Sequence, residues 1–211
     1  MRSVSEKIKQ RLLLKEQYVS TQQIRMIQIQ VNRFIRNEPS ALMLTSVDEH
    51  TENSLIAAKL AIAMAHQGKR VLLVDADLSS PTVHDLFQTK NGLGWADAVL
   101  ERRGVKNMLR ETLVPNLCLL TSGSPQRFSH DMWIPEKIQG VVEECKRAFD
   151  LILFKAPTFT SSAHAQLLVE CCEGVVLVAR TNKSKKEKLV TTVDAIERSG
   201  RKVFGTILQT G

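Results

Sequence analysis

The sequence predicts an α/β fold in which a doubly wound, mostly parallel sheet carries helices on both faces. Continuous apolar segments, typical of strands buried on both faces, alternate with helix-forming segments. Right-handed crossovers then make the doubly wound arrangement the expected one. The expected strands are 41–46, 70–77, 116–123, 150–157, 174–181 and 202–209, and the expected helices between them are 54–68, 131–148, 163–172 and 184–199.

The length of 211 residues, 43% of them hydrophobic, suits one domain with a buried core. A mostly helical segment is expected over 5–36, and Pro39 ends it. We therefore predict an N-terminal helical segment, residues 1–37, that packs on a single P-loop NTPase-like domain, residues 38–211.

The formal net charge is +7, and segments 1–40 and 180–202 hold much of the excess of basic residues. Aromatic residues do not interleave with these basic residues, so no nucleic-acid partner is expected. No apolar run of about 18 residues exists, which predicts no transmembrane helix. The N-terminus lacks the apolar core of a signal peptide and the cysteines lack a C-x-x-C pair, so a cytoplasmic location is expected.

Polar residues follow several expected strands, at 47–53, at Asp75 and Asp77, and at 121–124, 155–158 and 180–182. Because ligands of such sheets bind at the carboxyl ends of the strands, we expect the site at this edge.

The first strand, turn and helix, LTSVDEHTENSLIAAKLA (44–61), lie where a phosphate-binding loop would be. In G-x-x-x-x-G-K-[ST], glycines let backbone N–H groups face the phosphates, and the lysine and hydroxyl serve phosphate and Mg²⁺. Aligned with that motif, Glu52 replaces the second glycine, Asn53 replaces the lysine, and only Ser54 is kept. Carboxylates about 4 Å from a phosphate oppose it by roughly 4 kcal/mol at an effective dielectric constant of 20. Glu52 or Asp48 is expected to cap the helix instead.

VLLVDADLSSPTVHDLF (71–87) resembles the second aspartate motif of the bacterial tyrosine kinases of the capsular and exopolysaccharide type, in the MinD/ParA superfamily of P-loop proteins. The resemblance continues through GLGWADAVL (92–100), NLCLLTSG (116–123), residues 149–181 and VFGTILQ (203–209). It implies a domain that binds Mg-ATP, phosphorylates a C-terminal tyrosine cluster and is activated by a membrane polysaccharide copolymerase.

The resemblance implies roles for several residues. Asp75 and Asp77 match the pair that serves the metal and acts as base, and Ser54 and Asp77 are the metal candidates. Asp48 stands where the family often has a glycine, and Lys155 replaces the remaining metal-associated aspartate. Three placements of Lys155 are open. It pairs with Asp75 or Asp77 in place of the missing cation, extends to solvent, or reaches forward as a substitute phosphate lysine.

Other family features are weakened. The motif E-x-x-R-x-x-R, which assembles rings, reads Gln22, Arg25 and Gln28, and Tyr18 is the one tyrosine of the chain. His164 replaces an aspartate and is expected at the surface or at a helix start rather than as a ligand.

The phosphate lysine, the metal carboxylate and the tyrosine cluster of the family are all missing here. Their loss favours a catalytically inactive pseudokinase that needs no cofactor. It would regulate or scaffold polysaccharide biosynthesis at the inner face of the membrane, as a homo- or hetero-oligomer with a membrane copolymerase or an active kinase paralogue. One alternative is an ATP-dependent tyrosine kinase or ATPase that uses Lys155 and Asp77 with Mg-ATP. Another is a MinD/ParA-like positioning protein.

Overall fold

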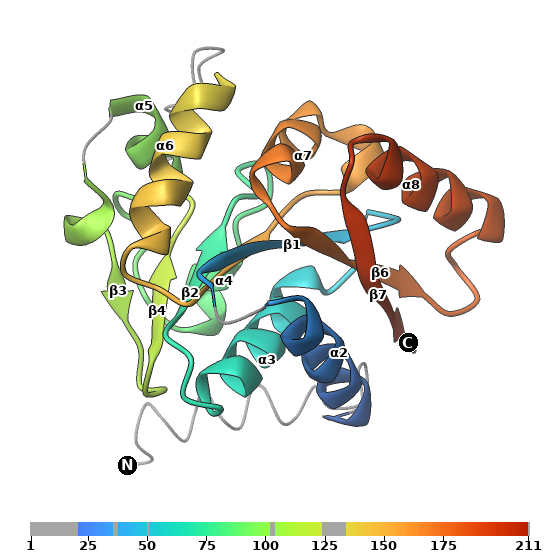
Figure 1. Ribbon diagram of the computed structural model, residues 1–211, viewed down its shortest axis with the longest axis horizontal. Helices are drawn as coiled ribbons and strands as arrows, with labels where there is room; N and C mark the ends of the chain where they lie inside the picture. Colours follow the sequence, from blue (N-terminus) through green and yellow to red (C-terminus); the bar gives the residue numbers. More distant parts are fainter. Residues whose placement is uncertain (1–20, 36–37, 50, 102–103, 124–133, 211) are drawn as a thin grey trace.

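A computed structural model describes residues 21–35, 38–49, 51–101, 104–123 and 134–210. Its centre is a seven-stranded sheet in the order β3-β4-β2-β5-β1-β6-β7 (Figure 1). All neighbouring strands are parallel except β3, which runs antiparallel to β4. The strands are β1 (Ser40–Ser46), β2 (Val71–Asp75), β3 (Arg110–Glu111), β4 (Leu117–Leu120), β5 (Leu151–Lys155), β6 (Gly174–Arg180) and β7 (Lys202–Gln209). The predicted fold class is confirmed.

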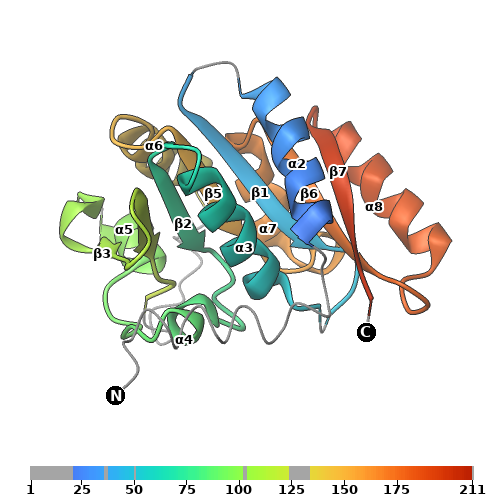
Figure 2. The same ribbon diagram turned by 90° about the horizontal axis from the view of Figure 1, so that it is seen from below.

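Helices cover both faces of the sheet, as Figures 1 and 2 show. One face packs on α2 (Thr21–Phe34), α3 (Asn53–Ala65) and the single turn α4 (Val83–Leu86). The other packs on α5 (Trp95–Glu101), α6 (Pro135–Lys146), α7 (Ala163–Leu168) and α8 (Lys186–Arg198). Short 3₁₀ helices form at Val105–Asn107, Phe159–Ser161 and Val169–Cys171. Every residue of β1, β2 and β5 is buried, which explains why their sequences are apolar without alternation.

Several boundaries differ from the prediction. Of the expected helix 5–36, residues 21–34 form α2, and residues 1–20 lie outside the described part of the chain. The expected strand 70–77 ends at Asp75, because the next residues turn toward α4. Strand β3 and helices α4 and α5, which are short, are not predicted from the sequence. The domain boundary between residues 37 and 38 stays a prediction.

Helix α2 packs across α3 and the edge strand β7. The rings of Phe34 and Phe204 stack with centroids 4.1 Å apart, and Gln28 donates from Nε2 to the carbonyl of Ala63 at 2.6 Å. Gln28 is therefore a buried packing residue, whereas Gln22 and Arg25 are exposed. Within the described residues, no helix has both the length and the apolar character needed to cross a bilayer.

Gly94, just before α5, provides a test of the packing at the end of β4. A Cβ at this position would overlap the carbonyl oxygen of Thr121, which accepts the backbone N–H of Trp95 at 2.7 Å. We expect Gly94→Ala to lower the free energy of unfolding by about 1–3 kcal/mol, measured by urea denaturation.

Gly140, exposed within α6, is the matched control, since a Cβ there meets no atom within 4 Å. Gly140→Ala should raise the free energy of unfolding by up to about 1 kcal/mol through helix propensity. Equal stability of the two variants would contradict the packing account.

Candidate functional site

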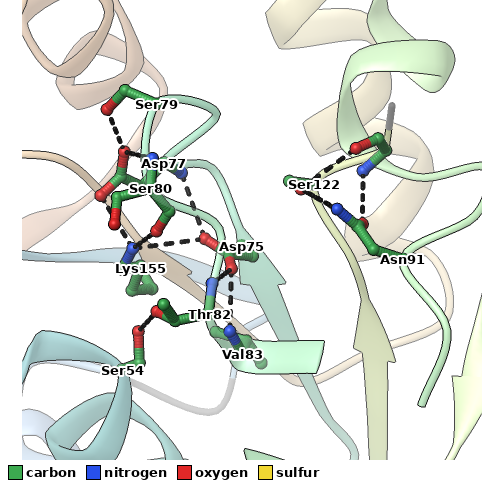
Figure 3. Close-up of polar contacts among 11 residues, drawn as sticks. Ser54, Asp75, Asp77, Ser79, Ser80, Thr82, Val83, Asn91, Ser122 and Lys155 are labelled. Atoms are coloured by element: carbon green, nitrogen blue, oxygen red, sulfur yellow. Dashed lines mark hydrogen bonds and ion pairs between the residues drawn. The ribbon is translucent and has the colours of Figure 1, made fainter. Parts of the chain in front are cut away.

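A cleft of about 890 Å³ opens at the carboxyl ends of β1, β2 and β5. Ser46, Asp77 and Lys155 line it from these three strand ends, and residues 51–54 line it from the loop and first turn of α3. The polar ends of β4 and β6, which the sequence analysis placed at the same site, are not among its lining residues. At the end of β4, Asn91 instead bonds the side chain of Ser122 at 3.0 Å (Figure 3).

Lys155 lies between the two aspartates (Figure 3). Its Nζ donates to Asp77 Oδ2 and to the carbonyl of Ser80, each at 2.8 Å, and lies 3.6 Å from Asp75 Oδ1. Only 3% of Lys155 is exposed. Of the three placements expected for this lysine, the structure has the internal ion pair, and with both aspartates.

Sheet register brings these groups together. Strands β2 and β5 are parallel neighbours, and Asp75 is the registered partner of Lys155 at their shared carboxyl end. Registered residues of neighbouring strands point to the same face of a sheet, so the carboxylate and the ammonium meet. Asp77, in the turn that follows β2, then reaches the same ammonium.

Asp75 organises the turn between β2 and α4. Its Oδ2 accepts the backbone N–H groups of Thr82 at 2.9 Å and Val83 at 3.0 Å, and its Oδ1 accepts that of Asp77 at 3.3 Å. Burial raises the pKa of the Asp75 carboxyl above its usual range. Lys155 and the two N–H groups oppose that rise without cancelling it.

The second carboxylate, Asp77, is also fully engaged by the chain. Its Oδ1 accepts the hydroxyl of Ser79 at 2.6 Å and the backbone N–H of Ser80 at 3.1 Å, while Oδ2 takes Lys155. Mg²⁺ prefers oxygen ligands in octahedral geometry, and here an ammonium lies where such an ion would meet the two aspartates. The residues of this site therefore do not fit the Mg-ATP that the fold family implies.

Asp48 does not cap α3, and this part of the prediction is wrong. Its carboxylate accepts from the hydroxyl of Ser184 and, at 2.8 Å, from Nζ of Lys188 on α8, because a nearby cation is a better partner than a helix end. Partial burial alone would raise the pKa of Asp48. The hydrogen bonds from Lys188 and Ser184 and the charges of Lys188 and Arg180 outweigh burial and lower it.

Glu52 is the residue that precedes α3, yet its side chain makes no capping hydrogen bond, which also contradicts the prediction. Its backbone N–H donates to Gln209 Oε1 at 3.2 Å, so this part of the loop is tied to β7. Asn53 Oδ1 accepts the hydroxyl of Thr51 at 2.7 Å, and the hydroxyl of Ser54 bonds that of Thr82. The loop is thus held by its own polar contacts.

Sequence reasoning missed Ser80, Thr82, Ser184 and Lys188 as partners of the site. Only the pair Ser79-Ser80, directly after the aspartates, carried a local signal, since short hydroxyl residues often bond a preceding carboxylate. His164 is the second residue of α7, as expected of a helix-start histidine, but it also lines the cleft. Burial lowers its pKa.

Removing the buried ammonium tests whether the ion pair is structural. Lys155→Met keeps the packing of the stem but leaves Asp75 and Asp77 without their cation, which should cost about 3–5 kcal/mol of stability at pH 7. Lys106, exposed on a 3₁₀ helix, supplies the control variant Lys106→Ala, expected within about 0.5 kcal/mol of the parent chain.

The difference in stability between Lys155→Met and the parent chain should depend on pH, in a direction that the pKa of Asp75 sets. The folded-state pKa of Asp75 lies above its unfolded value and rises further when Lys155 is removed. Such a group contributes stability below the unfolded pKa of about 3.9 and loses it as the pH rises through the folded pKa. Urea denaturation should therefore give a gap between Lys155→Met and the parent chain that widens from pH 5 to pH 7. A gap that narrows over this range would contradict the ion-pair account.

A family model described as cellulose biosynthesis protein BcsQ matches residues 40–194. The tyrosine-protein kinase YwqD of Bacillus subtilis is 31% identical over 178 residues, which cover 82% of this chain and 73% of that protein. The putative tyrosine-protein kinase CapB of Staphylococcus aureus is 26% identical over 172 residues, with coverage of 82% and 75%.

Solved structures give the same fold. The chimerical protein CapA2B2 has a TM-score of 0.75 at 24% identity, with 84% of this chain and 80% of that one covered. The kinase domain of the Escherichia coli tyrosine kinase ETK has a TM-score of 0.75 at 20% identity, with coverage of 83% and 69%. MinD of Pyrococcus horikoshii, solved with Mg-ADP, has a TM-score of 0.69 at 18% identity, with coverage of 80% and 69%. The sequence relatives show that the chain belongs to the bacterial tyrosine kinase family, and its fold is also that of MinD.

Proposed function

We propose that this chain is a catalytically inactive member of its family, a pseudokinase that regulates or scaffolds capsular or exopolysaccharide biosynthesis through protein partners. Two of its relatives are named as tyrosine-protein kinases, and the family model that it matches is described as a cellulose biosynthesis protein. The observation that carries the proposal is the ammonium of Lys155, buried between Asp77 at 2.8 Å and Asp75 at 3.6 Å.

Electrostatics explains why this ammonium opposes catalysis by the family's chemistry. Lys155 neutralises the carboxylates that would otherwise attract a divalent cation, and a cation entering beside it would meet a like charge. Moving Lys155 away would break its contacts to Asp77 and to the carbonyl of Ser80. The cost would be that of breaking a buried, hydrogen-bonded ion pair.

The loop before α3 would also disfavour the phosphates of a nucleotide, independently of Lys155. Asn53 replaces a lysine with a neutral amide, and Glu49 and Glu52 add carboxylates to the lining of the same cleft. A carboxylate about 4 Å from a phosphate oxygen would oppose binding by roughly 4 kcal/mol at an effective dielectric constant of 20. Compared with the family's pattern, the residues at the metal position and those at the phosphate position therefore both disfavour binding of Mg-ATP.

An active enzyme is the second candidate, because Ser54, Asp77 and Lys155 still line one cleft. In that function Lys155 would leave the aspartates and contact a phosphate of ATP directly. A positioning role like that of MinD is favoured by the shared fold alone.

Calorimetric titration with ATP and ADP, with and without Mg²⁺, separates the first two candidates. We expect no binding heat up to millimolar nucleotide, because the charges of the cleft oppose a triphosphate. Lys155→Met and Lys106→Ala are titrated in parallel. Micromolar binding of Mg-ATP that Lys155→Met abolishes and Lys106→Ala retains would replace the pseudokinase proposal by an unconventional kinase or ATPase.

The partner is expected to be the membrane polysaccharide copolymerase or an active kinase paralogue of the same bacterium, which would bring the chain to the inner face of the membrane. Each purified candidate, mixed with this chain, should give a larger species in size-exclusion chromatography with light scattering, with or without Mg-ATP. A complex that forms only with Mg-ATP would contradict inactivity, and failure to bind either candidate would contradict the scaffold role. Binding to anionic vesicles alone, lost at high salt, would favour the positioning role instead.

A further inference from the structure

The cleft is lined by several hydroxyl side chains in addition to the residues aligned with the family's nucleotide site. Hydroxyl side chains reach it from three loops, among them Thr51, Ser79 and Ser161. The hydroxyls of Thr51 and Ser79 donate inward, to Asn53 at 2.7 Å and to Asp77 at 2.6 Å. Because each proton is used within the protein, each oxygen keeps a lone pair that can accept a hydrogen bond from a ligand.

Asn53 adds an amide donor to the same cleft. The residue is 7% exposed and lines the cleft, and its Oδ1 takes the hydroxyl of Thr51. Its amide nitrogen Nδ2 has no acceptor among the residues that the structure describes, and it is not one of the fully buried polar atoms that lack a partner. The nitrogen is therefore accessible and can donate a hydrogen bond to a ligand in the cleft.

Charge narrows the class of ligand. The ammonium of Lys155, which lines the cleft, already donates hydrogen bonds to Asp77 and to the carbonyl of Ser80. Glu49, Glu52 and Asp85 line the cleft as carboxylates. The lining therefore combines a neutral amide donor with many hydroxyl and carboxylate acceptors, which suits a ligand that carries many O–H donors and no negative charge.

We propose that the cleft binds a polyhydroxylated, non-anionic small molecule, a sugar or an amino sugar. A volume of about 890 Å³ lies within the usual range of small-molecule sites, about 300–1,000 Å³. The inference rests on the proposed function in one respect, that Mg-ATP does not occupy the cleft.

Glucose, glucosamine and glucuronate test it, since they share one ring and differ in charge. Titration of the full chain, followed by ligand-observed NMR, should show binding of glucose and several-fold tighter binding of glucosamine, because the lining carboxylates attract its ammonium. Glucuronate should bind at least several-fold more weakly than glucose. No binding of glucose or glucosamine, or glucuronate binding as tightly as glucose, would overturn the proposal.

Two variants locate the binding. Asn53→Leu removes the amide donor and should weaken glucose binding by about tenfold, whereas Asn107→Ala, on an exposed 3₁₀ helix, should leave it unchanged. Glu49→Gln, which removes the charge of an exposed carboxylate of the lining but keeps an acceptor oxygen, should weaken glucosamine binding several-fold more than glucose binding. Undiminished glucose binding by Asn53→Leu would overturn the assignment to this cleft.

Mg-ATP is titrated in the same assay, so the two proposals fail separately. Binding of Mg-ATP would overturn the inactivity on which the sugar site rests. If neither Mg-ATP nor glucose nor glucosamine binds, the sugar proposal is overturned and the pseudokinase proposal is retained.

Discussion

The ammonium of Lys155, held between Asp77 and Asp75, is the interaction on which the site depends. Each of these three groups would be unfavourable in this position without the others, since charges buried without partners are costly. Together they form a closed set in which both carboxylates are satisfied by the chain itself. An ammonium can take the part of a divalent ion in neutralising two carboxylates, but it offers no open coordination position to a substrate oxygen.

Asp75 connects the ion pair to the backbone of the turn that follows β2. Its hydrogen bonds to the backbone of Thr82 and Val83 fix the start of α4, and the hydroxyl of Thr82 then meets that of Ser54 at the start of α3. The chain that follows β2 is in this way joined to the chain that follows β1. Asp75 thus holds the shape of the turn between β2 and α4 through hydrogen bonds that do not require a bound metal.

The sequence was sufficient for six of the seven strands. The apolar runs of β1, β2, β5 and β6 are clear because these strands are buried on both faces. It also placed Asp75, Asp77 and Lys155 at one edge, since all three lie at or just past strand ends. It could not decide between the three placements of Lys155, because that choice depends on β2 and β5 being neighbours in register. The partners of Asp48 lie on the connection to α8 and on α8 itself, 136 and 140 residues away along the chain, and no local pattern announces them. Short elements such as β3 and α4 are set by tertiary packing, which local propensity does not encode.

The tie between Asp48 and α8 has a consequence for signalling. Loops that hold nucleotide phosphates act as switches because hydrolysis removes one of their partners and the loop rearranges. In this chain the loop is fastened by a carboxylate to Ser184 and Lys188, and neither partner is consumed by a reaction. Under the proposed inactivity, no nucleotide hydrolysis would rearrange this loop. The signal to a partner would then depend on the amount of this protein in the cell and not on the time since the last hydrolysis.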